Sequence, residues 1–403
     1  MVLLGDEEIG VLVRRGEASR FEPAEAWAEM PAGVRPVLGQ QFEEDPFAAH
    51  GTSYGVPSWF EHVLPEMSGP LRNAVARSLD LSPARSYALL VALGEDLPGA
   101  VRVRALEDES VTTVARRERR QREPSEQNSE ALPLRVSLAG LQFKLSARVG
   151  NRGVALAAHG EEGDWIVKFA DQRFPTLPVN EFVTMSWAQA SGLIVPELRL
   201  ERTELIAGLD ALGDGIGDLA FVIKRYDRSP GGRIHQEDLA QVLGIAPGDA
   251  KYRDTNIDTI VRVVAELAPQ DVDELLSRLA FCVLCGNDDA HAKNWSLVYP
   301  DRVRPRLSFA YDLLSTIEYY PQNEMSLKIA KARRFSQVDR ARFRSLACRV
   351  NLSPDRVDDV VVSAVRRQAA AWTEIREGEH VSPALRQLID QRLNDLPIVR
   401  ESV

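Results

Sequence analysis

The chain has 403 residues, of which 44% are hydrophobic, so it is long enough for two or three domains with buried cores. Its formal net charge of −10 argues against a nucleic-acid-binding surface along the whole chain, but not against a local basic patch. The acidic N-terminus and the lack of apolar runs of about 18 residues argue against a signal peptide and a membrane span, so we expect a cytoplasmic protein without membrane contact.

Residues 1–106 are expected to form a small N-terminal α/β domain. Apolar runs near the start predict a hairpin, 57–81 and 86–93 have helical spacing, and 98–104 predicts a returning strand. None of these segments has catalytic spacing, and His62 is interpreted as a packed or surface residue.

Residues 107–131 differ sharply in composition from what precedes them. They are dense in both charge signs and nearly free of large apolar side chains. Such a segment cannot bury enough surface to offset its ordering entropy, which predicts a flexible linker. An arginine cluster at 116–122 is a candidate contact for nucleic acid or a partner, but the acids around it favour a solvated linker.

From residue 132 to 232 the pattern predicts a strand-rich lobe. Residues 135–149 form a strand, a tight loop of small residues and a second strand, and such a loop lets backbone N–H groups approach phosphate, with Lys144 adding charge. The next strand carries Lys168, and Glu181 opens the helix that follows. A pairing of these two side chains is the arrangement used by protein kinases. The alternative is a glutamate favoured only by the helix dipole.

Two further strands, 198–206 and 219–226, complete this lobe, and the second would end in a hinge whose backbone meets adenine. Residues 233–403 are expected to form a helical lobe, because 257–284, 351–375 and 384–395 have helical apolar spacing.

The helical lobe holds the most informative stretch, a D-x-H-x-K-N run that begins at Asp289 and ends at Asn294. Protein kinases place a carboxylate and an asparagine at this spacing, the first to accept the substrate hydroxyl proton and the second to bind Mg²⁺. A second metal-binding carboxylate should follow a couple of dozen residues later, and Asp312 stands there after an apolar run.

Other interpretations of this stretch remain open. The acids can be solvated loop residues and His291 a surface histidine, or Asp289 and His291 can be the ligands of a metallohydrolase, although no zinc-type spacing accompanies them. The pair Cys282-x-x-Cys285 has the spacing of a redox motif, but its apolar, helical context favours packing cysteines, and three cysteines in all predict no disulfide framework.

Taken in order, the motifs resemble those of the HipA family of serine/threonine kinases, the toxins of bacterial toxin–antitoxin pairs. The resemblance covers nearly the whole chain. Its segments are WFEHVLPE at 59–66, LPGAVRV at 97–103, SLAGLQFK at 137–144, WIVKF at 165–169, NEF at 180–182, KRYDR at 224–228, IHQED at 234–238, NDDAHAKN at 287–294 and YDLLS at 311–315.

The resemblance implies an α+β, two-lobed protein-kinase-like fold with a small N-terminal accessory domain and a mostly helical C-terminal lobe. It implies ATP and Mg²⁺ as cofactors, Asp289 as the proton acceptor, and Asn294 and Asp312 as metal ligands. It also implies that Ser137 matches the serine that family members autophosphorylate to inactivate themselves. The residues it implies for ATP binding are Ala139, Gly140, Leu141, Gln142, Phe143, Lys144, Lys168, Lys224, Arg225, Tyr226, His291, Lys293 and Tyr311, with Glu181 as the supporting ion pair.

The implied partners are a small HipB-like DNA-binding antitoxin, through which DNA is mainly contacted, and a protein substrate such as an aminoacyl-tRNA synthetase. The chain departs from the family pattern at Phe143 and Lys224, where a glutamate is usual. Two alternatives stay open: a small-molecule phosphotransferase that shares the kinase-like core, and a catalytically weak corepressor that acts with an antitoxin.

Overall fold

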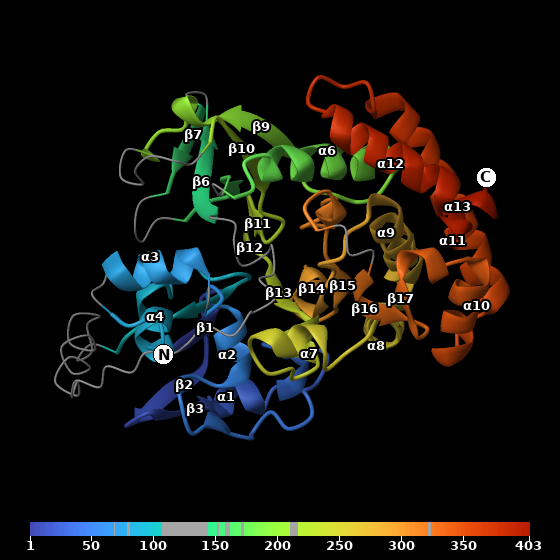
Figure 1. Ribbon diagram of the computed structural model, residues 1–403. Coiled ribbons are helices and arrows are strands. Elements are labelled where there is room, and N and C mark those ends of the chain that lie inside the picture. Colours follow the sequence, from blue (N-terminus) through green and yellow to red (C-terminus); the bar gives the residue numbers. More distant parts are fainter. Residues whose placement is uncertain are drawn as a thin grey trace, which may run out of the picture.

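The structure is a computed structural model (Figure 1) that describes residues 1–67, 69–78, 81–106, 144–150, 153–157, 162–170, 173–209, 217–320 and 324–403. The expected linker at 107–131 lies outside these ranges. Within them, no helix is both long enough and apolar enough to cross a membrane.

The N-terminal part is a five-stranded antiparallel sheet with short helices packed on it. The sheet order is β4-β3-β2-β1-β5. The stretch expected as one helix over 57–81 is two helices, because Pro65 interrupts the helical hydrogen bonding and Pro70 starts a new helix. The elements are β1 (Val2–Leu4), β2 (Glu7–Arg15), β3 (Ala18–Pro23), α1 (Glu25–Ala28), β4 (His50–Thr52), α2 (Ser58–His62), α3 (Pro70–Ser78), α4 (Ser86–Ala92) and β5 (Val101–Val103).

The second part is another five-stranded sheet, in the order β7-β6-β8-β10-β9, with one long helix. Valine, isoleucine and aromatic residues dominate the central strands β8 and β10, as expected for strands buried on both faces. The register pairs Lys168 with both Lys144 and Phe221, so two lysines lie side by side at the end of the sheet. The elements are β6 (Lys144–Gly150), β7 (Gly153–Leu156), β8 (Trp165–Lys168), α6 (Leu177–Ala190), β9 (Leu198–Arg202) and β10 (Leu219–Lys224).

The third part is mostly helical and shares its large core with α6. Its longest helix, α11, starts where Ser353 accepts a hydrogen bond from the Arg356 N–H and Pro354 occupies the first turn. The helices are α7 (Leu239–Val242), α8 (Ile257–Leu267), α9 (Val272–Cys285), α10 (Arg340–Arg349), α11 (Pro354–Ile375), α12 (Pro383–Asp395) and α13 (Pro397–Arg400). Short strands accompany them: β11 (Arg228–Ser229), β12 (Gly232–Arg233), β13 (His235–Asp238), β14 (Ser296–Tyr299), β15 (Arg306–Leu307), β16 (Glu324–Ile329) and β17 (Ala332–Arg334).

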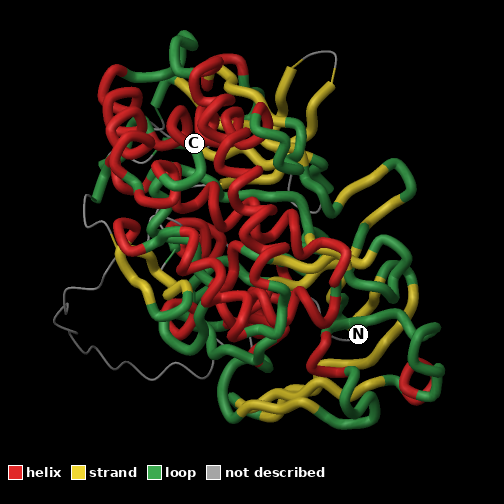
Figure 2. Tube along the Cα trace, turned by 90° about the vertical axis from the view of Figure 1, so that its right-hand side faces the viewer, coloured by secondary structure: helices red, strands yellow, loops and turns green. Residues whose placement is uncertain are grey.

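The α+β architecture agrees with the fold expected from the sequence. Figure 2 shows the helices of the third part gathered above the strands of the N-terminal sheet. Cys282 and Cys285 are buried free thiols in α9, where burial raises the pKa of both, so the structure supports packing over redox chemistry.

Candidate active site

A buried ion cluster lies where the second sheet meets the helical part. The Lys168 ammonium, at the end of β8, donates hydrogen bonds to Glu181 Oε1 of α6 at 2.5 Å and to Asp312 Oδ1. Burial opposes the charge on Lys168, but the two carboxylates raise its pKa above the usual value. Burial likewise opposes the charge on Asp312, but Lys168 and Lys144 hold its pKa far below the usual range. Lys168 and Asp312 therefore stay ionised at neutral pH, whereas burial raises the pKa of Glu181 above its usual value against the charge of Lys168.

Lys144 stands next to this cluster on the neighbouring strand β6. Its side chain keeps contact with solvent, yet desolvation lowers the pKa of its ammonium while the charge of Asp312 opposes that shift. Lys144 and Lys168 thus place two cations at the end of the second sheet, beside the carboxylates of Glu181 and Asp312, where a polyphosphate could bind.

The D-x-H-x-K-N run begins where α9 ends. Gly286 takes the left-handed conformation that closes the helix, with φ of 72°, and a Cβ there would lie 2.4 Å from Ile317. The Asn287 side chain then donates to the Asp312 carbonyl at 3.1 Å and accepts the Asp289 N–H at 3.0 Å. The loop is thus held to the segment that carries the second acid.

Asp289 is held by a residue that the sequence analysis missed. The Tyr252 hydroxyl donates to Asp289 Oδ1 at 2.8 Å, and the Tyr252 ring meets the His291 ring edge to face at 5.0 Å. The neighbouring Lys251 is buried and paired with Glu66 of the N-terminal domain. Tyr252 lies 37 positions before Asp289, so no local pattern in the sequence signals this contact.

Asn294 and Asp312 lie together, as a metal site requires. Asn294 Nδ2 donates to Asp312 Oδ2 at 3.4 Å, while its Oδ1 accepts the His291 N–H at 3.0 Å. Asp312 has a φ of 53°, which an aspartate adopts at some cost and which is typical of functional positions. A carboxylate and an amide oxygen are ligand types that suit Mg²⁺, so Asp312 and Asn294 are the residues that would hold it, with phosphates and water as its further ligands.

His291 is almost fully buried, at 2% exposed, and neither ring nitrogen has a hydrogen-bond partner among the described residues. Burial, followed by the charges of Lys251 and Lys293, lowers its pKa well below the usual value, so the ring is neutral. This buried neutral imidazole, between Asp289 and Asn294 in the sequence, is therefore a candidate contact for a ligand.

Lys293 points away from this cluster. Its ammonium donates to Asp238 Oδ2 at 2.9 Å and to the His62 carbonyl at 3.0 Å, and lies 3.2 Å from His62 Nδ1. His62 is therefore packed at the junction with the N-terminal domain. The Lys293 carbonyl accepts a hydrogen bond from the Tyr311 hydroxyl at 2.8 Å, so Tyr311 supports the same loop.

Tyr226 joins an aromatic group at the hinge expected over 224–226. Its ring stacks on Phe309 at 6.2 Å and lies 5.6 Å from Tyr311. The main-chain N–H groups of Lys224 and Arg225 donate to the carbonyls of Glu197 and Asp164. The side chain of Lys224 is exposed, whereas that of Arg225 is buried.

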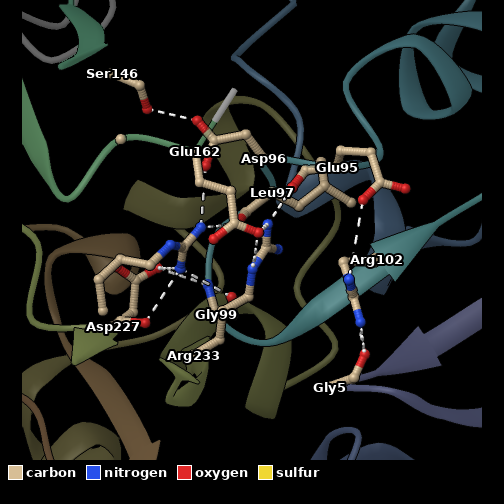
Figure 3. Close-up of polar contacts among 12 residues, drawn as sticks. Gly5, Glu95, Asp96, Leu97, Gly99, Arg102, Ser146, Glu162, Asp227 and Arg233 are labelled. Atoms are coloured by element: carbon tan, nitrogen blue, oxygen red, sulfur yellow. Dashed lines mark hydrogen bonds and ion pairs between the residues drawn. The ribbon is translucent and has the colours of Figure 1, made fainter. Parts of the chain in front are cut away.

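The arginines after β10 bind the N-terminal domain (Figure 3). Asp96 accepts hydrogen bonds from Arg225 at 2.7 Å, from Arg228 at 3.0 Å and from Ser146 of β6 at 2.5 Å. The Gly99 N–H donates to Asp227 at 2.7 Å. One loop of the N-terminal domain thus contacts both the second sheet and the segment that leads into the helical part.

The remaining predicted residues precede the described start of β6. Ser137, Ala139, Gly140, Leu141, Gln142 and Phe143 lie outside the described residues. Of the predicted set, the structure brings Lys144, Lys168, Glu181, Asp289, His291, Asn294 and Asp312 to one place, and it leaves the ammonium of Lys293 and the side chains of Lys224 and Arg225 directed elsewhere. Within the described ranges, no group of three or more His, Cys, Asp or Glu side chains is placed to hold a metal.

Comparisons with known proteins agree over most of the chain. The family model described as HipA-like C-terminal domain matches residues 136–372, and that described as HipA N-terminal domain matches residues 1–104. A Sinorhizobium fredii protein named "Putative kinase Y4dM" is 38% identical over 91% of this chain and 90% of its own length. The serine/threonine-protein kinase toxin HipA of Shewanella oneidensis is 27% identical over 81% of this chain and 77% of its own length.

A solved structure shares the fold. The Shewanella oneidensis HipA, HipB and operator DNA complex contains a chain that superposes with a TM-score of 0.71 at 22% identity, covering 100% of this chain and 98% of that one. The two-lobed arrangement and the docked N-terminal domain are therefore those of a solved kinase-like fold.

Proposed function

The chain belongs to the HipA family, and we propose that it is an ATP- and Mg²⁺-dependent serine/threonine protein kinase. One observation carries the proposal: Lys168, Glu181 and Asp312, up to 144 positions apart, form one buried ion cluster. The catalytic loop with Asp289 and Asn294 is bonded to the same aspartate. Phosphoryl transfer needs this combination of a phosphate-binding cation, metal ligands and a proton acceptor.

Different charged groups would bind different parts of MgATP. Lys168, held in place by Glu181, would contact the nucleotide phosphates, and Lys144 would add a second positive charge from the adjoining strand. Asp312 and Asn294 would hold Mg²⁺, which supplies neutralisation of the charge on the β- and γ-phosphates. Tyr226 and the segment around it would face the adenine.

Asp289 would accept the proton of a serine or threonine hydroxyl. As that oxygen forms its bond to the γ-phosphorus, the bond from phosphorus to the β,γ-bridging oxygen breaks and ADP leaves. Tyr252 holds Asp289 Oδ1 from one side and so fixes the direction in which the carboxylate faces the acceptor. Catalysis then consists of positioning and charge stabilisation rather than of a covalent intermediate.

The partner proposed for this kinase is a HipB-like DNA-binding antitoxin, because the structural relative is a HipA, HipB and operator DNA complex. The net charge of −10 fits DNA contact mainly through the antitoxin. The proposed substrate is a protein of the translation machinery such as an aminoacyl-tRNA synthetase.

Regulation through Ser137 completes the proposal. A phosphate there would add about two negative charges at the start of the phosphate loop. That charge disfavours ATP, so we expect autophosphorylation to inactivate the enzyme. Incubation with MgATP, mapping of phosphosites and titration of ATP before and after would test this; a Ser137-phosphorylated form that still binds ATP tightly would contradict it.

The test of the main proposal is incubation of the full chain with labelled ATP, Mg²⁺ and bacterial lysate, followed by mass spectrometry of labelled proteins. We expect labelled serine or threonine in at least one protein and none with Asp289→Asn. Label confined to small molecules would identify a small-molecule phosphotransferase, and no label at all would favour a corepressor without kinase activity.

A further inference from the structure

The hairpin formed by β16 and β17 is strongly basic in an acidic protein. Residues 324–349, which contain the hairpin and α10, hold eight Lys or Arg and two Asp or Glu, against a net charge of −10 for the chain. The arginines of α10 face acids of neighbouring helices: Arg340 binds Asp358, and Arg349 binds Asp258. The charge left for other partners is therefore concentrated on the hairpin itself.

Four cations lie on the hairpin. Lys328 and Lys331 are exposed, and neither has a hydrogen-bond or ion-pair partner among the described residues. Arg333 and Arg334 share one half-exposed acid, Glu324, at 3.5 and 3.7 Å. Exposed pairs at such distances are weak, so this face keeps an excess of positive charge.

The hairpin is attached to the catalytic loop. The Ser326 N–H donates to the carbonyl of Asp288, next to the proposed proton acceptor, at 2.9 Å. Burial alternates along β16, with Met325, Leu327 and Ile329 buried, so Lys328 lies on the same face as Ser326. Lys328 lies two strand residues, or about 7 Å, beyond Ser326. It is therefore only a few peptide residues away from a substrate hydroxyl that reaches the loop of Asp289.

The tip of the hairpin is held in a costly conformation. Its two turn residues, Ala330 and Lys331, have φ of 43° and 72°, where glycine, asparagine or aspartate is usual. The Ala330 N–H donates to Asp258 at 2.8 Å, and Arg342 donates to the Ala330 carbonyl at 2.9 Å. The tip is thus anchored from two helices, and Lys331 at that tip is exposed to solvent.

We propose that the face carrying Lys328, Lys331, Arg333 and Arg334, named here the basic hairpin face, docks acidic residues of the protein substrate beside the phosphoacceptor. The inference rests on the proposed kinase function and adds a substrate class to it: serine or threonine sites with Asp or Glu two to four positions away on one side. A patch of four cations with one internal acid suits a short acidic segment, whereas nucleic acid requires a longer basic track along several phosphates.

The test uses the full-length protein and synthetic serine peptides of equal length whose flanking positions are all acidic, all alanine or all basic. Phosphate transfer from labelled MgATP gives kcat/KM for each peptide. Binding of fluorescein-labelled acidic peptide is measured separately by anisotropy without nucleotide. We expect the wild type to use the acidic peptide about threefold to thirtyfold better than the alanine peptide, an advantage that shrinks at high salt.

Two matched variants give the decisive comparison. Lys328→Glu combined with Lys331→Glu should remove the acidic preference and the binding, while the alanine peptide is phosphorylated as before. Arg304→Glu, a charge reversal at another exposed cation, between β14 and β15, should change neither.

Failure of this inference differs from failure of the kinase proposal. Equal use and equal binding of acidic and alanine peptides would overturn the docking face while leaving the kinase intact. Anisotropy that shows salt-sensitive binding of single-stranded RNA but not of acidic peptide would overturn it in favour of a nucleic-acid surface. If no phosphate is transferred to any peptide or lysate protein but acidic peptide still binds, the kinase proposal would be contradicted. The basic hairpin face would stand.

Discussion

The junction with the N-terminal domain and the active site both bury charged groups, but they satisfy them differently. At the junction Glu237 is fully buried, and its oxygens accept hydrogen bonds from the Gln40 N–H at 3.0 Å, from Trp59 Nε1 at 3.3 Å and from the Tyr299 hydroxyl. Every one of these partners is supplied by the protein, from both sides of the interface.

In the active site the partners are shared or missing. Lys168 serves two carboxylates, Asp312 has a positive φ, and both ring nitrogens of His291 lack a partner among the described residues. At Glu237 the protein itself supplies the hydrogen-bond donors, whereas under the proposed function ATP and Mg²⁺ would supply partners in the active site. Substitutions should therefore affect stability at the junction and phosphoryl transfer at the active site.

The largest expected effect is on transfer. Asp289→Asn or Asp312→Asn should lower the rate by at least ~10²-fold, the scale of losing a general base or a charge-stabilising group. Asp312→Asn should also weaken ATP binding more than Asp289→Asn does, because it alters a proposed metal ligand. Rates measured with labelled MgATP check this, with the exposed Asp301→Asn as control. Near-normal turnover in either variant would contradict the assignment.

Lys168→Ala should have the next largest effect. We expect ATP binding, measured by calorimetry, to weaken at least ~10-fold, because one cation and its two ion pairs are lost where a polyphosphate binds. The thermal unfolding curve should still show a folded protein. Arg304→Ala, which removes an exposed cation between β14 and β15, is the control. Normal ATP affinity in Lys168→Ala would transfer the role to Lys144.

Tyr252→Phe should have a smaller effect, confined to kcat. The change removes the hydroxyl that orients Asp289 and keeps the ring that packs on His291. A reduction in kcat of about 10-fold, with an unchanged KM for ATP, is the scale of one lost hydrogen bond to a charged group. Tyr54→Phe, at an exposed site of the N-terminal domain, should be silent. A rise in kcat would instead show that Tyr252 obstructs the acceptor.

Glu237→Gln should change how the free energy of unfolding depends on pH. It should leave phosphoryl transfer unchanged. Burial raises the pKa of Glu237 from 4.5 to about 7. The folded state therefore holds this proton more tightly than the unfolded state does. The resulting stabilisation is complete below about pH 4.5 and is lost as the pH rises through about 7.

The free energy of unfolding of the wild type should therefore fall across this window by an order of ~1–3 kcal/mol relative to the Gln variant. Urea unfolding at pH 5, 6, 7 and 8 measures the difference between the two proteins. An equal pH dependence in both would show that Glu237 is ionised throughout.

Local patterns account for the parts of the site that the sequence predicted. Asp289 and Asn294 lie five positions apart in one loop, and Asp312 follows a buried run, so their spacing alone suggests the roles proposed for them. Lys168 and Glu181 were recognised because a strand and a helix start have clear apolar periodicity. The lobes could be ordered for the same reason.

Contacts between distant segments had no such signal. Tyr252 meets Asp289 across 37 positions, Lys251 meets Glu66 across 185, and Lys293 meets His62 across 231. The sequence analysis assigned Lys293 to ATP and interpreted His62 as a packed or surface residue. The two residues are far apart in the sequence, so nothing near either one pointed to their contact.

The sequence by itself determined the α+β class, the order of the lobes and the chemical types of the core site, because these depend on short-range periodicity and on motif spacing. Only the tertiary structure decided that the N-terminal domain reaches the catalytic loop, that a tyrosine orients Asp289 and that a basic hairpin adjoins it. Those facts depend on how separately folded surfaces complement each other in shape and charge, which no stretch of a single chain encodes locally.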